Sequence, residues 1–303
     1  MHLVFAACMF TFLGEGCKAV KQDKLNQKLR TVSRVLLFLL VCLPVIAVLV
    51  MLLFILGVSF MDPSEIKELW DEGASAFHIL PAFFSVHSWK TVLNQTPEYL
   101  LHFWDSVWIS LPSVIGSVVV SVITAYGLTN IPFRGKRVLF LLMALIMLLP
   151  YQATLVPNYL LLDILDLIGT QIAVILPNVF HPLGIIAMAY FMEAVPKETV
   201  EAARVDGAGE FRIFAQIVIP QVRGGVAILA LYVFLDSWNL VEPILVLVQD
   251  AFKYPLSVAL NAVSNTDVGI WAVCSVLFVI PALIIFGMTG EQLIDGLTVR
   301  KKE

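Results

Sequence analysis

Charge is what this sequence lacks most. Only 14% of its 303 residues are Asp, Glu, Lys or Arg, whereas 59% are hydrophobic, and the mean hydropathy is +0.91. Soluble domains average about 25% charged and about 45–50% apolar residues. So few charged side chains cannot cover an apolar excess of this size in water. Lipid is therefore the expected surroundings of most of the chain.

Other absences exclude further classes of protein. The spacing of the four cysteines fits neither a metal site nor a disulfide-rich scaffold. The net charge of −4 argues against a protein that binds nucleic acid, which would be expected to carry an excess of basic residues. The alternating pattern of membrane barrel strands is missing, as is a Gly-x-x-x-x-Gly-Lys-Ser/Thr phosphate-binding loop. No cluster of catalytic or metal-binding side chains converges. The sequence therefore predicts no catalytic residue, no metal site and no cofactor bound by this chain.

Six stretches are apolar enough to cross a bilayer, which needs about 20 residues per helix. They span residues 35–60, 107–129, 138–162, 172–192, 224–248 and 268–290. They predict an all-α integral membrane domain over residues 35–290, with an N-terminal extension at 1–34 and a tail at 291–303.

The basic residues predict the orientation. Sixteen of the 19 lie before the first span, after the second, between the fourth and fifth, or in the tail. Because cytoplasmic loops are enriched in Lys and Arg, both termini are expected in the cytoplasm. Residues 18–34 fit either a short amphipathic helix on the inner leaflet or an ordinary positive flank.

Polar residues inside the spans are the candidate transport residues. Asp236 lies about 18 Å beyond Gly224 at about 1.5 Å per residue, and a carboxylate at the bilayer centre costs roughly 2.5–3.5 kcal/mol. Ser237, Trp238 and Asn239 follow it directly, and polar groups beside an indole suit a sugar. The stretch 236–239 therefore predicts either part of a translocation path or a structural break. His181 has no partner at a metal-ligand spacing, so interhelical hydrogen bonding or substrate contact are its alternatives.

Residues 193–223 form a connection too long for a tight turn. Pro196 is placed to begin a helix, and Gly207 to end it. Ala202 and Ala203 would leave a small surface for close approach, and a second apolar segment leads to Pro220. The pattern predicts a short helix presented to the cytoplasm for docking.

This loop resembles that of ABC importer permeases. Their motif is Glu-Ala-Ala, three residues, Gly, nine residues, Ile-x-Leu-Pro, and it matches from Glu201 to Pro220 with Ile219 in place of leucine. Asp206-Gly207-Ala208 resembles the carbohydrate-uptake branch. Further likeness to the maltose-permease second subunit and its relatives extends over roughly residues 35–300, for example at Ala125-Tyr126 and at Trp238-Asn239.

The resemblance implies a type I importer fold in a bacterial or archaeal inner membrane. It implies a second permease subunit, two copies of an ABC ATPase that bind ATP and Mg, an extracytoplasmic solute-binding protein and surrounding lipid as partners, and no nucleic acid. It assigns ATPase coupling to Glu201, Ala202, Ala203, Asp206, Gly207, Ala208 and Pro220. It assigns contact with the binding protein to Tyr254, Pro255 and Leu256.

The implied function is a permease subunit of an ATP-driven importer, with a sugar or oligosaccharide as the expected cargo. An importer of another solute is the main alternative. An ion-driven secondary transporter would require paired intramembrane ionisable groups or inverted repeats. Asp236 and Glu242 are the two candidates for such groups, and no repeat is present.

Overall fold

The computed structural model describes residues 24–70, 80–95, 98–263 and 267–298. Within these residues every regular element is a helix, apart from an isolated bridge between Met61 and Phe84. Most of the N-terminal extension and the last five residues of the tail lie outside the described residues.

The first half of the chain holds α2 (Lys24–Val58), α3 (Pro63–Trp70), α4 (His87–Lys90), α5 (Glu98–Asn130), α6 (Lys136–Leu148) and α7 (Tyr151–Ile164). The second half holds α8 (Ile172–Val179), α9 (Pro182–Glu193), α10 (Lys197–Val205), α11 (Glu210–Ile213), α12 (Ile219–Gln221), α13 (Arg223–Trp238), α14 (Glu242–Leu247), α15 (Leu256–Val263) and α16 (Val268–Thr298).

Four segments of the described chain are long and apolar enough to cross a membrane as they stand. They are Leu37–Val58, Tyr99–Asn130, Ile172–Glu193 and Val268–Gly290. The count rises to as many as six if each of two sharply bent helix pairs is one span. The all-α class expected from the sequence is confirmed.

Several expected spans are broken rather than straight. Where one helix is expected over residues 138–162, α6 and α7 meet at 104°, because Pro150 stands between them and begins α7 in extended backbone. The segment 172–192 is divided into α8 and α9 before Pro182. The segment 224–248 ends as a helix at Trp238 and resumes only at Glu242. Composition reveals an apolar stretch of the right length but does not show where proline interrupts it.

The chain separates into two compact units, residues 1–53 and residues 54–303. The described part of the first unit is most of α2, whose side chains from Leu37 to Leu53 are almost all exposed. The second unit carries the rest of the fold, including the small cluster of Val58, Met61, Ile66 and Ala272.

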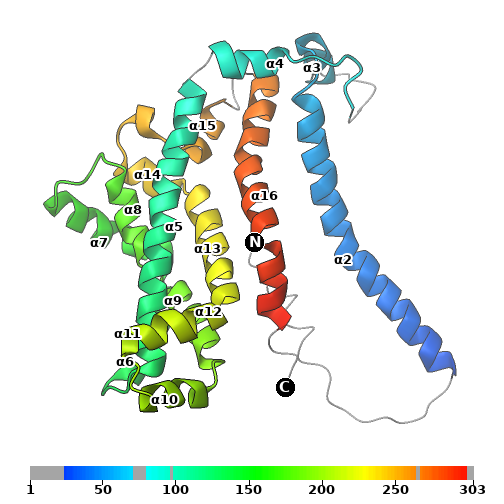
Figure 1. The fold of residues 1–303 in the computed structure, drawn as a ribbon. Helices are drawn as coiled ribbons and strands as arrows, with labels where there is room; N and C mark the ends of the chain where they lie inside the picture. Colours follow the sequence, from blue (N-terminus) through cyan, green and yellow to red (C-terminus); the bar gives the residue numbers. More distant parts are fainter. Residues whose placement is uncertain (1–23, 71–79, 96–97, 264–266, 299–303) are drawn as a thin grey trace. The chain divides into compact units, whose positions relative to one another are not determined.

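Helix α5 is the centre of the second unit, where it packs against α8, α9 and α13 (Figure 1). Its packing face is lined by small buried residues, which let backbones approach closely in a membrane. They are Ser106, Ser110, Ser113, Ser117 and Ser121. A Cβ built on Gly184 of α9 would lie 2.8 Å from the Oγ of Ser121, so a larger residue there would force side chains at this contact to shift.

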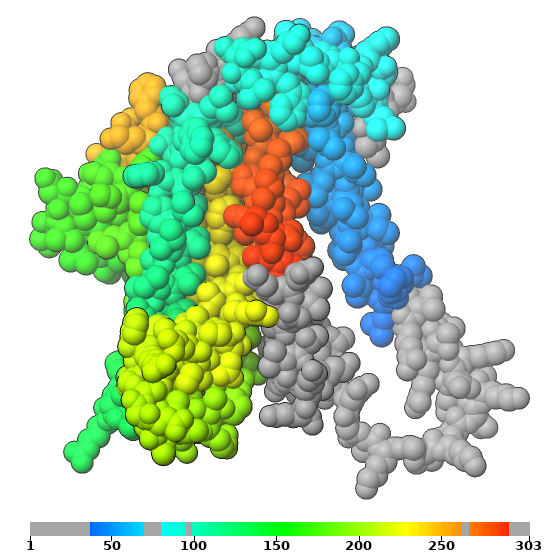
Figure 2. Space-filling view, viewed as in Figure 1, coloured from blue at the N-terminus to red at the C-terminus, as the bar shows by residue number. Residues whose placement is uncertain are grey.

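The segment from α10 to α12 lies at the C-terminal end of α5. It packs there on a hydrophobic cluster that includes Tyr126, Met192, Val200, Ile213 and Val218. Figure 2 shows its atoms, in yellow-green, projecting beyond the end of α5. The long connection predicted from the sequence is thus a folded element with its own buried contacts.

Candidate functional site

Helix α10 lies where the sequence predicts a helix, although Pro196 precedes it as the N-cap and is not its first residue. It begins directly after Pro196 and carries Glu198 in its first turn, where the helix dipole favours an anion. Asp206 caps its C-terminus with φ −72° and ψ 1°, and Gly207 follows with φ +82°. The prediction that Gly207 ends this helix is confirmed.

The end of α10 is closed by two backbone hydrogen bonds. The N–H of Gly207 donates to the carbonyl of Arg204, and the N–H of Ala208 donates to the carbonyl of Ala203, both at 3.0 Å. This pair of bonds defines a Schellman motif, in which the left-handed residue is usually glycine. The motif fixes the direction in which the chain leaves α10.

The alanines of the motif lie on different faces of α10. Ala203 is half-buried and packs on the chain's own core together with Ala208, whereas Ala202 is exposed. The sequence places both Ala202 and Ala203 on one docking surface, and the structure divides them because successive helical residues point about 100° apart. Pro220 is exposed at the start of α12.

Two large apolar side chains beside the Schellman turn are exposed. Val205 is 88% exposed and Phe211 is 82% exposed. Val205 ends α10 and Phe211 lies in α11, so the two flank the turn, and exposed large apolar residues near one another indicate contact with a partner. We define Glu201, Ala202, Val205, Gly207 and Phe211, all of them exposed, as the coupling surface, after the role that the sequence resemblance predicts for this loop.

Hydrogen bonds among three side chains hold this loop against the end of α5. The hydroxyl of Tyr126 donates to Glu210 Oε2 at 2.6 Å, and Arg204 Nε donates to Glu210 Oε1 at 2.8 Å. The guanidinium of Arg204 also donates to the carbonyl of Asn130 at 3.1 Å. We call Tyr126, Arg204 and Glu210 the latch, because they tie α10 and α11 to the same turn of α5.

The latch is charged under ordinary conditions. Hydrogen bonds from Arg204 and then from Tyr126 lower the pKa of the Glu210 carboxyl, and the bond to Glu210 raises the pKa of Arg204. The side chains of Arg204 and Glu210 are 37% and 49% exposed. Water therefore screens their attraction, so the pair adds little to the free energy of folding. Its main contribution is to hold α10 and α11 in position.

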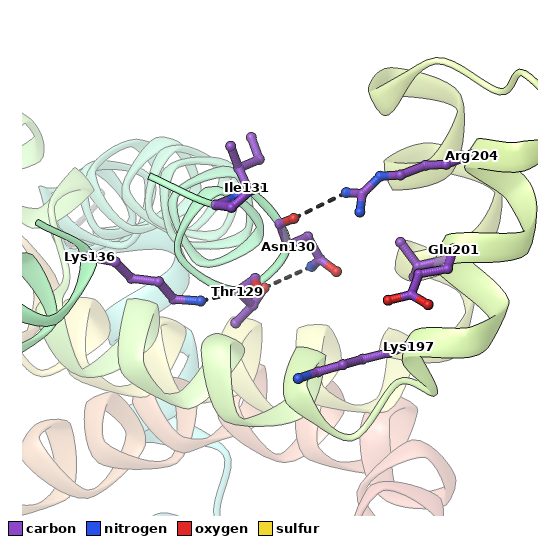
Figure 3. A pocket seen from close by; sticks show the side chains of 9 residues that line it. Thr129, Asn130, Ile131, Lys136, Lys197, Glu201 and Arg204 are labelled. Carbon is purple, nitrogen blue, oxygen red and sulfur yellow. Dashed lines mark hydrogen bonds between the residues drawn. The ribbon is translucent and has the colours of Figure 1, made fainter. Parts of the chain in front are cut away.

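A pocket of about 270 Å³ lies behind α10. Figure 3 shows Lys136 from α6 and Lys197, Glu201 and Arg204 from α10 around it. Lys136 donates to the carbonyl of Thr129 at 3.1 Å. Glu201 makes no hydrogen bond or ion pair with the described residues, so its carboxylate is free to bind a partner.

The four neighbours predicted to line a path separate into two pairs. Ser237 is buried, and its hydroxyl donates to the carbonyl of Val233 at 2.7 Å. Trp238 is 2% exposed, and its indole N–H donates to the carbonyl of Phe278 at 3.1 Å. Asp236 and Asn239 are exposed.

Trp238 is enclosed by aromatic rings of its own chain. It stacks on Phe234 at a centroid distance of 5.3 Å and meets Phe103 edge to face at 5.9 Å. The expectation that its indole plane lies open to a sugar therefore does not hold in this structure. Because one face of a helix is buried, four consecutive residues cannot all face a path.

The segment expected to contact a binding protein is also mostly buried. Leu256 is fully buried, and its N–H donates to the hydroxyl of Ser106 at 2.7 Å. Pro255 is buried, and the carbonyl of Tyr254 accepts from His102 Nδ1 at 2.7 Å. The exposed tip of this connection is Phe252, which is 75% exposed. Tyr254, Pro255 and Leu256 therefore anchor the loop, and Phe252 is its exposed residue.

Residues 117–291 match the family model described as "Binding-protein-dependent transport system inner membrane component". The chain belongs to this family of ABC importer permeases. The match covers more than half of the sequence and includes α10, the coupling surface and the latch residues. The family resemblance inferred from the Glu-Ala-Ala loop is confirmed.

Two curated relatives of this permease bear the same name, "Arabinooligosaccharides transport system permease protein AraQ". The protein from Halalkalibacterium halodurans is 31% identical over 222 residues, which are 72% of this chain and 80% of the relative. The protein from Bacillus subtilis is 27% identical over 252 residues, which are 82% of this chain and 88% of the relative.

A solved structure shows the same fold. It is described as the crystal structure of a bacterial ABC transporter involved in the import of the acidic polysaccharide alginate. The TM-score is 0.74 at 20% identity, and the match covers 91% of this permease and all of that chain. The importer permease fold expected from the sequence is thus supported by geometry.

Sequence reasoning missed the latch of this permease. Ala125-Tyr126 contributes to the family resemblance, but nothing in the sequence indicates that Tyr126 binds a residue 84 positions later. The charged pair Arg204 and Glu210 has one weak local signal, a separation of six residues across a glycine turn. Its connection to α5 depends on tertiary packing alone.

Proposed function

We propose that this chain is the membrane-spanning subunit of an ATP-driven, binding-protein-dependent importer for a sugar or oligosaccharide. It pairs with a second permease subunit, two copies of an ABC ATPase and an extracytoplasmic binding protein. ATP and Mg bind to the ATPase subunits, and this chain contributes half of the translocation path. The family membership and the arabinooligosaccharide permeases among its relatives support the proposal.

The observation that carries the coupling role is the exposed apolar pair on either side of the turn between α10 and α11. Val205 and Phe211 project from a folded loop, and the carboxylate of Glu201 on α10 makes no hydrogen bond or ion pair with the described residues. A cleft in an ATPase subunit would bury the two apolar groups and pair the carboxylate. Gly207 and Asp206 set the turn that presents these side chains.

The proposed topology has six spans with both termini in the cytoplasm. The coupling surface and the large majority of the basic residues then lie on one side, as the positive-inside rule requires. The segment between α14 and α15, with Phe252 at its tip, lies on the other side and contacts the binding protein. The setting is the inner membrane of a bacterium or archaeon.

Co-purification tests the coupling surface. A tagged permease with V205E and F211E should lose the associated ATPase, because two carboxylates would have to be desolvated in the cleft. E201A combined with G207P should lose ATP-driven uptake, since proline cannot adopt φ +82°. The matched control is E193A, which removes an exposed carboxylate at the end of α9.

The proposal fails if the ATPase remains bound to the V205E/F211E variant as it is to the control. The cargo needs a separate measurement, namely uptake of labelled arabinooligosaccharides by cells that carry or lack this gene. Equal uptake by the two strains would favour the alternative, an importer of the same family for another solute.

A further inference from the structure

The exposed side of α13 is polar, although the helix itself is apolar. Between Gly224 and Asn239 the exposed residues are Tyr232, Asp236 and Asn239, while the remaining side chains are buried or half-buried. Tyr232 is 40% exposed, and the carboxylate of Asp236 is 51% exposed. Their spacing of four and then three residues places the three on one helix face.

Two other helices of the unit, α5 and α16, expose apolar residues instead. The exposed face of α5 carries Ile115, Val119 and Ile123, each at least 50% exposed, and that of α16 carries Leu283 and Ile284. Apolar side chains are what lipid requires, whereas an exposed carboxylate within a span is costly there. The exposed face of α13 is therefore turned toward water rather than toward lipid.

Neighbouring elements extend this polar face. Nε2 of His181, at the break between α8 and α9, lies 3.9 Å from Asp236 Oδ2, and its ring meets that of Tyr232 edge to face at 5.4 Å. The Nδ1 atom of His181 accepts from the N–H of Gly184 at 3.2 Å. A neutral imidazole in this arrangement keeps its proton on Nε2, the atom that points toward Asp236.

Further exposed polar residues follow the end of α13. Glu242 is three residues beyond Asn239, so their Cα atoms lie within about 11 Å of one another. The carboxylate of Glu242 is exposed and accepts from Gln152 Nε2 of α7 at 3.0 Å. We call His181, Tyr232, Asp236, Asn239, Glu242 and Gln152 the polar track.

The polar track carries charge of one sign. Asp236 and Glu242 are its charged members, and the sequence has no lysine or arginine from 138 to 196 or from 224 to 252. An anion beside the track would meet two carboxylates and no counter-charge from these segments. Hydroxyl groups, in contrast, can donate to the carboxylates and to the amide oxygens.

We propose that the polar track of α7, α9, α13 and α14 lines a water-filled path that takes uncharged, hydroxyl-rich solutes and repels anionic ones such as uronic acid oligomers. The two exposed carboxylates within the apolar segment 224–248, with no basic group in the surrounding segments, carry this inference. It rests on the proposed function, because a path needs the assembled importer. It adds the residues of the path and the charge of the cargo.

Thiol labelling of the assembled importer tests the inference without knowledge of the cargo. In a background without the native cysteines, N239C is exposed to a cationic and to an anionic methanethiosulfonate reagent, with and without ATP. Rates are normalised to those of a free thiol in solution. We expect N239C to react in at least one state, with a preference for the cationic reagent of roughly tenfold, the order expected for a unit charge 4–8 Å away in water-like surroundings.

Two kinds of control define the outcome. S237C, two residues earlier and buried, and I115C, on the exposed apolar face of α5, should both stay unlabelled by charged reagents. Adding D236N and E242Q to N239C should keep the labelling but remove the preference for the cationic reagent.

Absence of labelling at N239C in both states would overturn the water-filled path, because the face would then be covered by the second permease or by lipid. Labelling with no charge preference, or with a preference that survives D236N and E242Q, would overturn the repulsion of anions. The ATPase content of each labelled preparation is measured in parallel. Loss of the ATPase from the unsubstituted complex would count against the proposed function itself and not against the track.

Discussion

Tyr126 and Glu210 are joined by a 2.6 Å hydrogen bond between the end of α5 and the start of α11. The tyrosine is 6% exposed, so its hydroxyl meets the carboxylate at the boundary between the helix core and the loop from α10 to α12. Phe214 packs edge to face on the same ring at 5.0 Å. A movement of α10 and α11 must therefore either carry the end of α5 with it or break this contact.

The first prediction concerns coupling through this contact. Y126F keeps the ring packing but removes the hydroxyl, which costs about 1 kcal/mol for a bond with one partly solvated partner. We expect uptake per ATP hydrolysed to fall severalfold in reconstituted vesicles, while ATP hydrolysis continues. The control is Y190F, because the hydroxyl of Tyr190 makes no hydrogen bond with the described residues. An unchanged ratio in Y126F would show that the latch transmits no movement.

The second prediction is a pH dependence of stability. The ordinary pKa of the Glu210 carboxyl is 4.5, and the bonds from Arg204 and Tyr126 lower it in the folded chain. A lowered pKa adds stability above pH 4.5, and this stability is lost as the pH falls through the lowered value. The thermal midpoint of the wild type should exceed that of E210Q at neutral pH by an amount equivalent to about 1 kcal/mol or less. A difference that persists unchanged at pH 3 would contradict this origin.

The third prediction tests the turn after α10. A Cβ on Gly207 meets no atom within 4 Å, so the cost of G207A comes from its φ of +82° and is about 1–2 kcal/mol. G207N should cost less, because asparagine tolerates the left-handed region better than alanine does. Gly209, with φ −68°, is the matched control, and G209A should be nearly neutral. Thermal unfolding of the purified chain measures all three, and equal effects of G207A and G209A would rule out backbone strain.

The sequence predicted the parts of this fold that depend on local pattern. The end of helix α10 could be predicted at Gly207 because a Schellman turn favours glycine at one position. A single glycine in the sequence therefore indicates where the helix ends. Apolar stretches revealed the spans because lipid requires them over a known length. Both signals reside in consecutive residues and need no knowledge of distant contacts.

The functional faces were less predictable for a physical reason. The sequence grouped Asp236 with Ser237 and Trp238 because they are neighbours, yet adjacent helical residues point in different directions. Asp236 instead meets His181, which lies 55 positions earlier at a helix break. Which side of α13 is buried depends on where α5 and α16 pack, and periodicity is weak in a helix that is apolar nearly all round.

The fourth prediction concerns the loop before α15. Ser106 accepts a 2.7 Å hydrogen bond from the buried N–H of Leu256 and donates at 3.1 Å to the carbonyl of His102. S106A leaves the N–H of Leu256 without its partner, which costs roughly 1–3 kcal/mol in a buried site. We expect the segment from Gln249 to Leu256 to become more sensitive to protease, and binding of the solute-binding protein to weaken as Phe252 loses its fixed position.

The control for the loop is S113A. The hydroxyl of Ser113 is buried on the same helix but donates only to the carbonyl of Ile109 at 2.7 Å, so its loss frees no N–H group. Proteolysis of S113A should match that of the wild type. If S106A and S113A are cleaved at the same rate, the bond from Leu256 to Ser106 does not hold the loop. If S106A is cleaved faster but binds the partner normally, Phe252 is not the contact residue.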